Sequence, residues 1–159
     1  MRIGQGFDAH PFVGGRPLIL GGVLVAHPKG LDGDSDGDVL THAIMDALLG
    51  ALALGDLGTW FRADDPTVHG ARSTDLLMRV MAMVRERGYS VAQVDTTVIG
   101  EKPKVRPLVP SIRDALSPIL MAAPEDISIK ATTTDQMGWL GREEGLAALA
   151  LVQLQNHND

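Results

Sequence analysis

Residues 145–154 read GLAALALVQL, and the first eight of these ten positions are glycine or apolar residues. A strand that is apolar at successive positions is typically buried on both faces of a sheet. In a chain of 159 residues, helices can cover one face of such a sheet, and the other face then packs against a second copy of the protein. The segment therefore predicts a sheet with helices on one side only.

The rest of the chain mixes strand and helix patterns. Further strands are expected at 2–8, 91–99 and 127–134, the last of these with clean alternation, and the Gly21-Gly22 pair in PLILGGVLV predicts a hairpin. Amphipathic or apolar periodicity predicts helices at 39–54, 72–87 and 110–121. This order favours an α+β fold, with one mixed sheet and its helices packed on one face, within a single domain of residues 1–159.

Composition excludes several classes of protein. A formal net charge of −6 argues against nucleic-acid binding, and no apolar run reaches the roughly 18 residues that a membrane span needs. The chain has no cysteine, so it has neither disulfides nor cysteine metal ligands, and a cytoplasmic location is expected. The N-terminus lacks the patterns of secretory and transit peptides. Any metal site must therefore use Asp, Glu and the five histidines.

Residues 32–38, DGDSDGD, resemble the opening of a calcium-binding EF-hand loop. Such a loop needs a bidentate glutamate at its twelfth position and a helix on each side. Counting from Asp32, the twelfth position is Ala43, and glycines and prolines interrupt the segment before the loop. The calcium interpretation fails on both points, whereas Asp38 is well placed to cap the helix expected from residue 39.

Two pairs of residues are candidate metal ligands. Asp8 and His10 lie two apart on an expected strand and so share a face; a strand-end ion pair is the alternative explanation. His42 and Asp46 lie four apart on an otherwise apolar helix, where they either satisfy each other in the core or form a metal ligand and its orienting group. Three ligands of the types Asp, His and His would leave a fourth position open, as in catalytic zinc sites.

Two further segments carry polar groups suited to phosphate. Lys102, Lys104 and Arg106 alternate in a proline-stiffened loop and are a possible phosphate clamp, although a solvated surface loop is the simpler explanation. The segment 130–135, KATTTD, places three hydroxyls and a carboxylate at a strand end, where they could hold a phosphate and a divalent cation. Together these features suggest a metal-dependent reaction on a phosphorylated small molecule.

Three segments, MRIGQGFDAHPF, SDGDVLTHAIMDALLGALALGDLG and IKATTTDQMGWLGREEG, resemble the 2-C-methyl-D-erythritol 2,4-cyclodiphosphate synthase family of the non-mevalonate isoprenoid pathway. The resemblance implies a lyase that releases CMP from a cytidine diphosphate-linked substrate. It also implies a homotrimer with active sites between subunits, Zn²⁺ on Asp8, His10 and His42, and Mg²⁺ or Mn²⁺ on Asp135.

The same resemblance assigns the remaining site residues. Asp34, Ser35 and Thr133 would act in catalysis, with Asp38 and Asp46 as orienting groups. The substrate contacts would be Asp56, Leu57, Gly58, Phe61, Arg62, Ala63, Asp64, Asp65, Gly100, Glu101, Lys102, Pro103, Lys104, Val105, Arg106, Thr132, Thr134, Trp139 and Arg142. Phe7 and Glu144, with Trp139 and Arg142, would line a cavity on the trimer axis that is associated with isoprenoid diphosphates.

The chain departs from the family pattern at two positions. Asp34 stands where the family commonly has histidine, and a carboxylate there would repel a phosphate. Asp135 stands where the family usually has glutamate, and it is shorter by one methylene. These departures leave the alternative of a trimeric isoprenoid-diphosphate or metal-binding protein with impaired catalysis. A metal-dependent phosphohydrolase is a separate, third interpretation.

Overall fold

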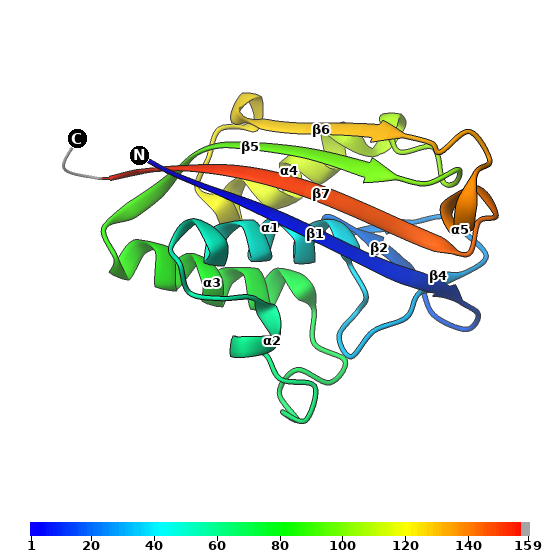
Figure 1. Cartoon of the computed structure of the whole chain (residues 1–159), viewed down its shortest axis with the longest axis horizontal. Helices are drawn as coiled ribbons and strands as arrows, with labels where there is room; N and C mark the ends of the chain where they lie inside the picture. The colour runs from blue at the N-terminus through cyan, green and yellow to red at the C-terminus, as the bar shows by residue number, and fades with distance from the viewer. Residues whose placement is uncertain (157–159) are drawn as a thin grey trace.

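The computed structural model describes residues 1–156. Its main sheet has five strands in the order β4-β1-β7-β5-β6, and a separate hairpin pairs β2 with β3 (Figure 1). The main-sheet strands are β1 (Arg2–Val13), β4 (Gly30–Leu31), β5 (Tyr89–Ile99), β6 (Ile127–Thr132) and β7 (Gly145–Asn156), and the hairpin strands are β2 (Leu18–Leu20) and β3 (Val23–Val25). The β5–β6 pair is parallel and the other pairs are antiparallel, so the sheet is mixed, as predicted.

Three longer helices lie on one side of the sheet, also as predicted (Figure 1). They are α1 (Val39–Ala51), α3 (Ser73–Glu86) and α4 (Val109–Leu120). Helix α1 packs directly on β1 and β7, and almost all of its residues are buried. The core therefore lies between α1 and the inner face of the sheet, where alternate β7 residues from Leu146 to Leu154 are almost fully covered.

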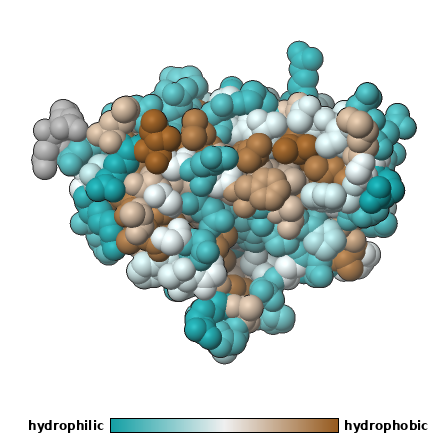
Figure 2. Space-filling model, in the orientation of Figure 1, coloured by the Kyte–Doolittle hydropathy of each residue, from teal (hydrophilic) through white to brown (hydrophobic). Residues whose placement is uncertain are grey.

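The outer face of the sheet is open in the single chain. Ile3, Phe7 and Leu151 are 58%, 55% and 48% exposed there, and Figure 2 shows hydrophobic surface along this band. β7 is thus buried on its helix side, whereas Leu151 on its other side is exposed in the single chain.

The sequence patterns did not predict several short elements. These are β4, α2 (Leu57–Trp60), α5 (Gly138–Gly141) and two 3₁₀ turns at Arg106–Leu108 and Pro124–Asp126. Each has four residues or fewer, too few to show a periodic pattern. The first strand also continues to Val13 instead of ending at residue 8, because β7 and then β4 pair with its second half.

Candidate metal centre

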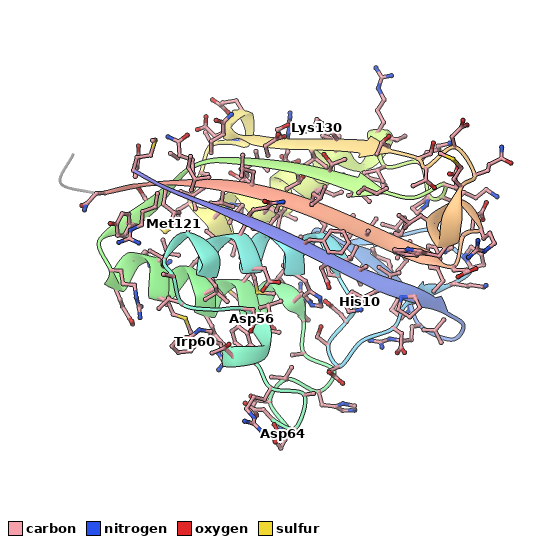
Figure 3. All side chains as sticks on the ribbon, viewed as in Figure 1. His10, Asp56, Trp60, Asp64, Met121 and Lys130 are labelled. Atoms are coloured by element: carbon pink, nitrogen blue, oxygen red, sulfur yellow. The ribbon has the colours of Figure 1, made fainter. Side chains whose placement is uncertain are left out.

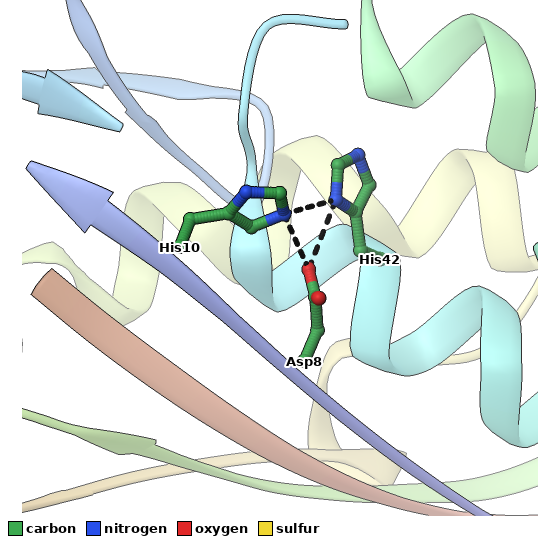
Figure 4. A group of neighbouring side chains, drawn as sticks. All are labelled: Asp8, His10 and His42. Atoms are coloured by element: carbon green, nitrogen blue, oxygen red, sulfur yellow. Dashed lines mark hydrogen bonds and ion pairs between the residues drawn. The ribbon is translucent and has the colours of Figure 1, made fainter. Parts of the chain in front are cut away.

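Asp8, His10 and His42 meet at one point (Figure 4). Asp8 and His10 project from the helix-facing side of β1, and His42 projects from the first turn of α1. The distance from Asp8 Oδ2 is 2.8 Å to His10 Nε2 and 3.0 Å to His42 Nδ1, and the two ring nitrogens are 3.0 Å apart. Asp8 and His10 thus form one cluster with His42, although His42 lies 32 or more positions away from them in the sequence.

The pKa values reflect this cluster. Burial acts to raise the pKa of Asp8, but hydrogen bonds and attraction from His10 and His42 outweigh it and hold that pKa well below its usual range. Burial acts to lower the pKa of His10, but the Asp8 carboxylate and a backbone hydrogen bond with Asp32 raise it overall. The carboxylate is therefore ionised near neutral pH, as metal ligation requires.

The donor set fits zinc. Tetrahedral Zn²⁺, with bonds of about 2.0–2.1 Å to nitrogen and oxygen, holds its ligand atoms roughly 3.3 Å apart. The three atoms here form a triangle with edges of 2.8–3.0 Å, which needs only a small expansion. Two imidazoles and one carboxylate supply three ligands and leave a fourth position free for substrate or water.

The two predicted orienting aspartates take different places. Asp38 is fully buried, and its carboxylate accepts hydrogen bonds from Gly21 N (2.9 Å), Gly22 N (2.7 Å), Thr41 N (3.1 Å) and Thr41 Oγ1 (2.7 Å). It caps α1, as expected from the sequence, and also fixes the β2–β3 turn; burial raises its pKa.

Asp46 does not pair with His42, so the direct contact considered for this pair is wrong. Its Oδ1 instead accepts a hydrogen bond of 2.8 Å from the backbone N–H of Leu57, at the start of α2, and burial raises its pKa. Four-residue spacing places two side chains on one face of a helix, but here each finds its partner on another element. Asp46 thus holds the start of α2 in place, and its interaction with His42 is electrostatic, without a direct hydrogen bond.

A hollow of about 260 Å³ opens beside the cluster. Its lining includes many of the predicted site residues: Asp8, His10, Asp34, Ser35, His42, Leu57, Gly58, Phe61 and Ala63. The other four predicted substrate contacts between positions 56 and 65 lie outside this hollow. Asp56 caps α2, Arg62 pairs with Asp64 at 2.9 Å on an exposed loop tip (Figure 3), and Asp65 accepts from Thr67 within that loop.

The two segments that the sequence suggested for phosphate binding, the loop after β5 and the end of β6, line a second hollow of about 190 Å³. It is lined by Gly100, Glu101, Pro103, Lys104, Val105, Arg106, Ala131, Thr132 and Thr133. Lys102 instead points to Glu143, at 3.2 Å, so the expected three-residue basic clamp is reduced to Lys104 and Arg106. The two hollows share no lining residue.

The loop after β6 holds the remaining predicted residues in an exposed position. Glu101 Oε1 accepts hydrogen bonds from Thr134 N (3.2 Å) and Gln136 N (3.1 Å), which ties this loop to the one after β5. Asp135 is exposed and has a left-handed φ of 54°. Asp135 does not line the second hollow, although Thr133, two residues before it, does.

The residues expected on a trimer axis are also exposed. Phe7 lies on the open face of the sheet, Trp139 is 39% exposed on α5, and Arg142 pairs with Glu144 at 2.6 Å just before β7. The described residues leave all four accessible to a neighbouring subunit.

Sequence reasoning missed two residues that hold the site together. Arg16 binds the carbonyl oxygens of Gly33 (2.8 Å) and Ser35, which fixes the DGDSDGD loop. Ser73 contacts the far side of the His42 ring. Glu101 was predicted as a substrate contact, and in the structure it ties together the loops after β5 and β6. A lone arginine in a loop and a serine at the start of a helix have no distinguishing pattern, so no sequence signal identifies these two residues.

The fold and the cluster define a class of protein: an α+β sheet that carries, on its helix side, three residues able to hold a metal ion next to an open hollow. Residues 1–155 match the YgbB family, and the chain belongs to that family. It is 52% identical over 153 residues, 96% of each chain, to 2-C-methyl-D-erythritol 2,4-cyclodiphosphate synthase of Synechococcus elongatus.

Solved structures agree with this assignment. The chain superposes with a TM-score of 0.93 at 37% identity on the bifunctional IspDF of Campylobacter jejuni, covering 99% of this chain and 43% of that one. It superposes with a TM-score of 0.89 at 35% identity on a 2C-methyl-D-erythritol-2,4-cyclodiphosphate synthase in a CDP-bound form, covering 97% and 100% of the two chains. The family and fold expected from the sequence are confirmed.

Proposed function

We propose that this protein converts 4-diphosphocytidyl-2-C-methyl-D-erythritol 2-phosphate to 2-C-methyl-D-erythritol 2,4-cyclodiphosphate and CMP. The Asp8–His10–His42 cluster is the observation that supports the proposal most strongly, because its three side chains could hold a metal ion. The chain is also 52% identical to an enzyme named 2-C-methyl-D-erythritol 2,4-cyclodiphosphate synthase. The relatives' names do not favour the alternative of an impaired binding protein.

The reaction needs little acid–base chemistry. An oxygen of the 2-phosphate forms a bond to the β-phosphorus of the diphosphate, and the bond from that phosphorus to the CMP oxygen breaks, so CMP leaves with the electron pair. A phosphate monoester has a second pKa of about 6 and is mostly dianionic near neutral pH, so no general base is required. The main obstacles are repulsion between the anions and in-line placement.

The chain's own residues address these obstacles. Asp8, His10 and His42 would hold Zn²⁺, and Asp135 would hold Mg²⁺ or Mn²⁺. When bound, these cations would neutralise phosphate charge and polarise the β-phosphate. Ser35 would donate a hydrogen bond to the substrate phosphate, and Thr133 would donate one to the transferring phosphate. Lys104 and Arg106 would bind the diphosphate of the nucleotide.

The open face of the sheet supports a homotrimer. Ile3, Phe7 and Leu151 form an apolar strip that a neighbouring subunit would cover. Assembly would place the hollow beside Asp8, His10 and His42 (the metal hollow) of one subunit opposite the second hollow, which Lys104 and Arg106 line, of the next subunit. An isoprenoid diphosphate would bind in the axis cavity. No described helix has the length and apolarity needed to span a membrane. A cytoplasmic location and a single domain over residues 1–159 are part of the proposal.

The test is product analysis. Purified protein loaded with zinc and supplied with magnesium should convert the substrate stoichiometrically to CMP and cyclic diphosphate, as followed by ³¹P NMR. Release of inorganic phosphate in place of the cyclic product would instead indicate a phosphohydrolase. No reaction by the zinc-loaded protein would contradict the proposal.

A further inference from the structure

The far side of the His42 ring is bonded as tightly as the side that faces Asp8 and His10. His42 Nε2 lies 2.8 Å from Ser73 Oγ and 3.0 Å from Ser35 Oγ. Ser73 is the first residue of α3 and is fully buried, while His42 is only 8% exposed. Solvent therefore has little access to this nitrogen, and the protein itself must satisfy it.

Asp36 completes the chain of contacts. Its Oδ1 lies within hydrogen-bond distance of Ser73 Oγ, and its Oδ2 accepts the backbone N–H of Ser73 at 3.0 Å. An aspartate carboxylate can only accept hydrogen bonds, so the hydroxyl proton of Ser73 points to Asp36. The serine oxygen then has only lone pairs left for the ring, so this 2.8 Å contact is a hydrogen bond only when Nε2 carries the proton. The Ser35 hydroxyl lies 3.3 Å from Ser73 Oγ and can donate to that oxygen instead of to the ring.

We propose that the Ser73–Asp36 pair positions His42 for metal binding by holding its proton on Nε2. In neutral imidazole, one nitrogen carries the proton and the other has the lone pair. A proton fixed on Nε2 leaves the lone pair on Nδ1, the nitrogen that faces Asp8 and His10. Ser73 and Asp36 are positioning residues, since they act through His42 and do not line the hollow.

This inference rests on the proposed function only for the identity of the metal, so its test measures zinc binding rather than turnover. Full-length protein, stripped with a chelator, is titrated with Zn²⁺ against a chromophoric competitor. Ser73→Ala should weaken zinc binding about 10–100-fold, the usual effect of losing a partner of a ligating histidine. Asp36→Asn should weaken it similarly, because an amide can donate to Ser73 and turn its hydroxyl proton toward Nε2.

Thr74→Ala is the matched control. Thr74 is the next residue of α3, is 6% exposed and does not line the metal hollow, so this variant should bind zinc as the unaltered protein does. A second measurement separates positioning from folding. In zinc-loaded protein with ¹⁵N-labelled histidine, His42 should show a slowly exchanging Nε2 proton, which exchanges faster in Ser73→Ala at unchanged thermal stability.

The outcomes are distinct. Unchanged zinc affinity in folded Ser73→Ala, or a His42 proton on Nδ1 in the loaded protein, would overturn the inference. Absence of zinc binding by the unaltered protein would overturn it together with the zinc assignment. A protein that shows the expected zinc losses but releases no CMP would leave the inference standing and remove the proposed function alone.

Discussion

Gly6 on β1 lies against the backbone of α1, so that a Cβ at this position would stand 2.0 Å from the carbonyl oxygen of Ala43. Gly4, one step along the same face, meets the carbonyl oxygen of Ala47 in the same way, at 1.9 Å. A helix carbonyl cannot move aside as a flexible side chain can. These two glycines therefore set the close approach of β1 to α1, and with it the distance of Asp8 and His10 from His42.

Gly6→Ala should push β1 away from α1. We expect it to lower the free energy of unfolding by about 3 kcal/mol, the upper range for overpacking, and to weaken zinc binding in the protein that still folds. Urea unfolding and zinc titration measure the two effects. Gly14→Ala is the control, because a Cβ there would contact nothing within 4 Å. Equal unfolding midpoints for the two variants would contradict this explanation of the packing.

Asp38→Ala should destabilise the fold without touching the metal ligands. It removes an N-cap, typically worth about 1 kcal/mol, and leaves buried donors of Gly21, Gly22 and Thr41 unpaired at about 1–3 kcal/mol. We expect a total loss of about 2–4 kcal/mol by urea denaturation. Asp114→Ala, at an exposed position on α4, should change stability by less than about 0.5 kcal/mol. A similarly small effect for Asp38→Ala would refute the double role of this carboxylate.

Asp34 lines the metal hollow, where its negative charge opposes a phosphate. Asp34→His should raise kcat/KM for CMP release about 10-fold, equivalent to about 1.4 kcal/mol, a reasonable size for one charge interaction near a protein surface. Asp34→Ala removes the charge without adding a ring donor, so its gain should be smaller. If both variants lose activity, Asp34 makes a favourable contribution that electrostatics alone does not explain.

The ion pair of Asp95 and Lys130 lies on the open face of the sheet. The hydrogen bond from Lys130 holds the pKa of Asp95 below its ordinary value. Stability from a lowered carboxyl pKa is present above the unfolded value of 3.8 and is lost as pH falls through the folded value. Because both groups are about half exposed, the effect at pH 7 should be at most about 1 kcal/mol.

Lys130→Met should therefore cost this small amount at pH 7 and nothing at a pH below the lowered pKa of Asp95. Urea unfolding across pH measures the difference from the unaltered protein. Lys29→Met is the control, since no carboxylate partner of Lys29 is found among residues 1–156. A difference that grows toward acid pH would reverse the assigned sign.

The sequence predicted the layers of the fold because periodic patterns report burial directly. The apolar run of β7 indicated a central strand, and spacing placed Asp8 beside His10 on one face. Spacing alone could not bring this strand to His42, because the approach depends on Gly4 and Gly6 packing against backbone. The role of Ser73 was also beyond sequence reasoning, since a serine at a helix start usually serves only as a cap.

For Asp46, by contrast, the spacing suggested a direct contact that the structure does not have. Its spacing from His42 was correct for a shared helix face, but its carboxylate bonds the backbone of Leu57. A helical pattern predicts which side chains are neighbours, whereas tertiary contacts decide which neighbours bond. The family resemblance supplied the ligand set that spacing left open.

The most direct test of the metal centre is a crystal structure of the zinc-loaded protein, with diffraction recorded on both sides of the zinc absorption edge. We expect one anomalous peak about 2.0–2.2 Å from Asp8 Oδ2, His10 Nε2 and His42 Nδ1. Ser73 should remain hydrogen-bonded to His42 Nε2. A peak elsewhere, or a His42 ring that binds the metal through Nε2, would contradict the account.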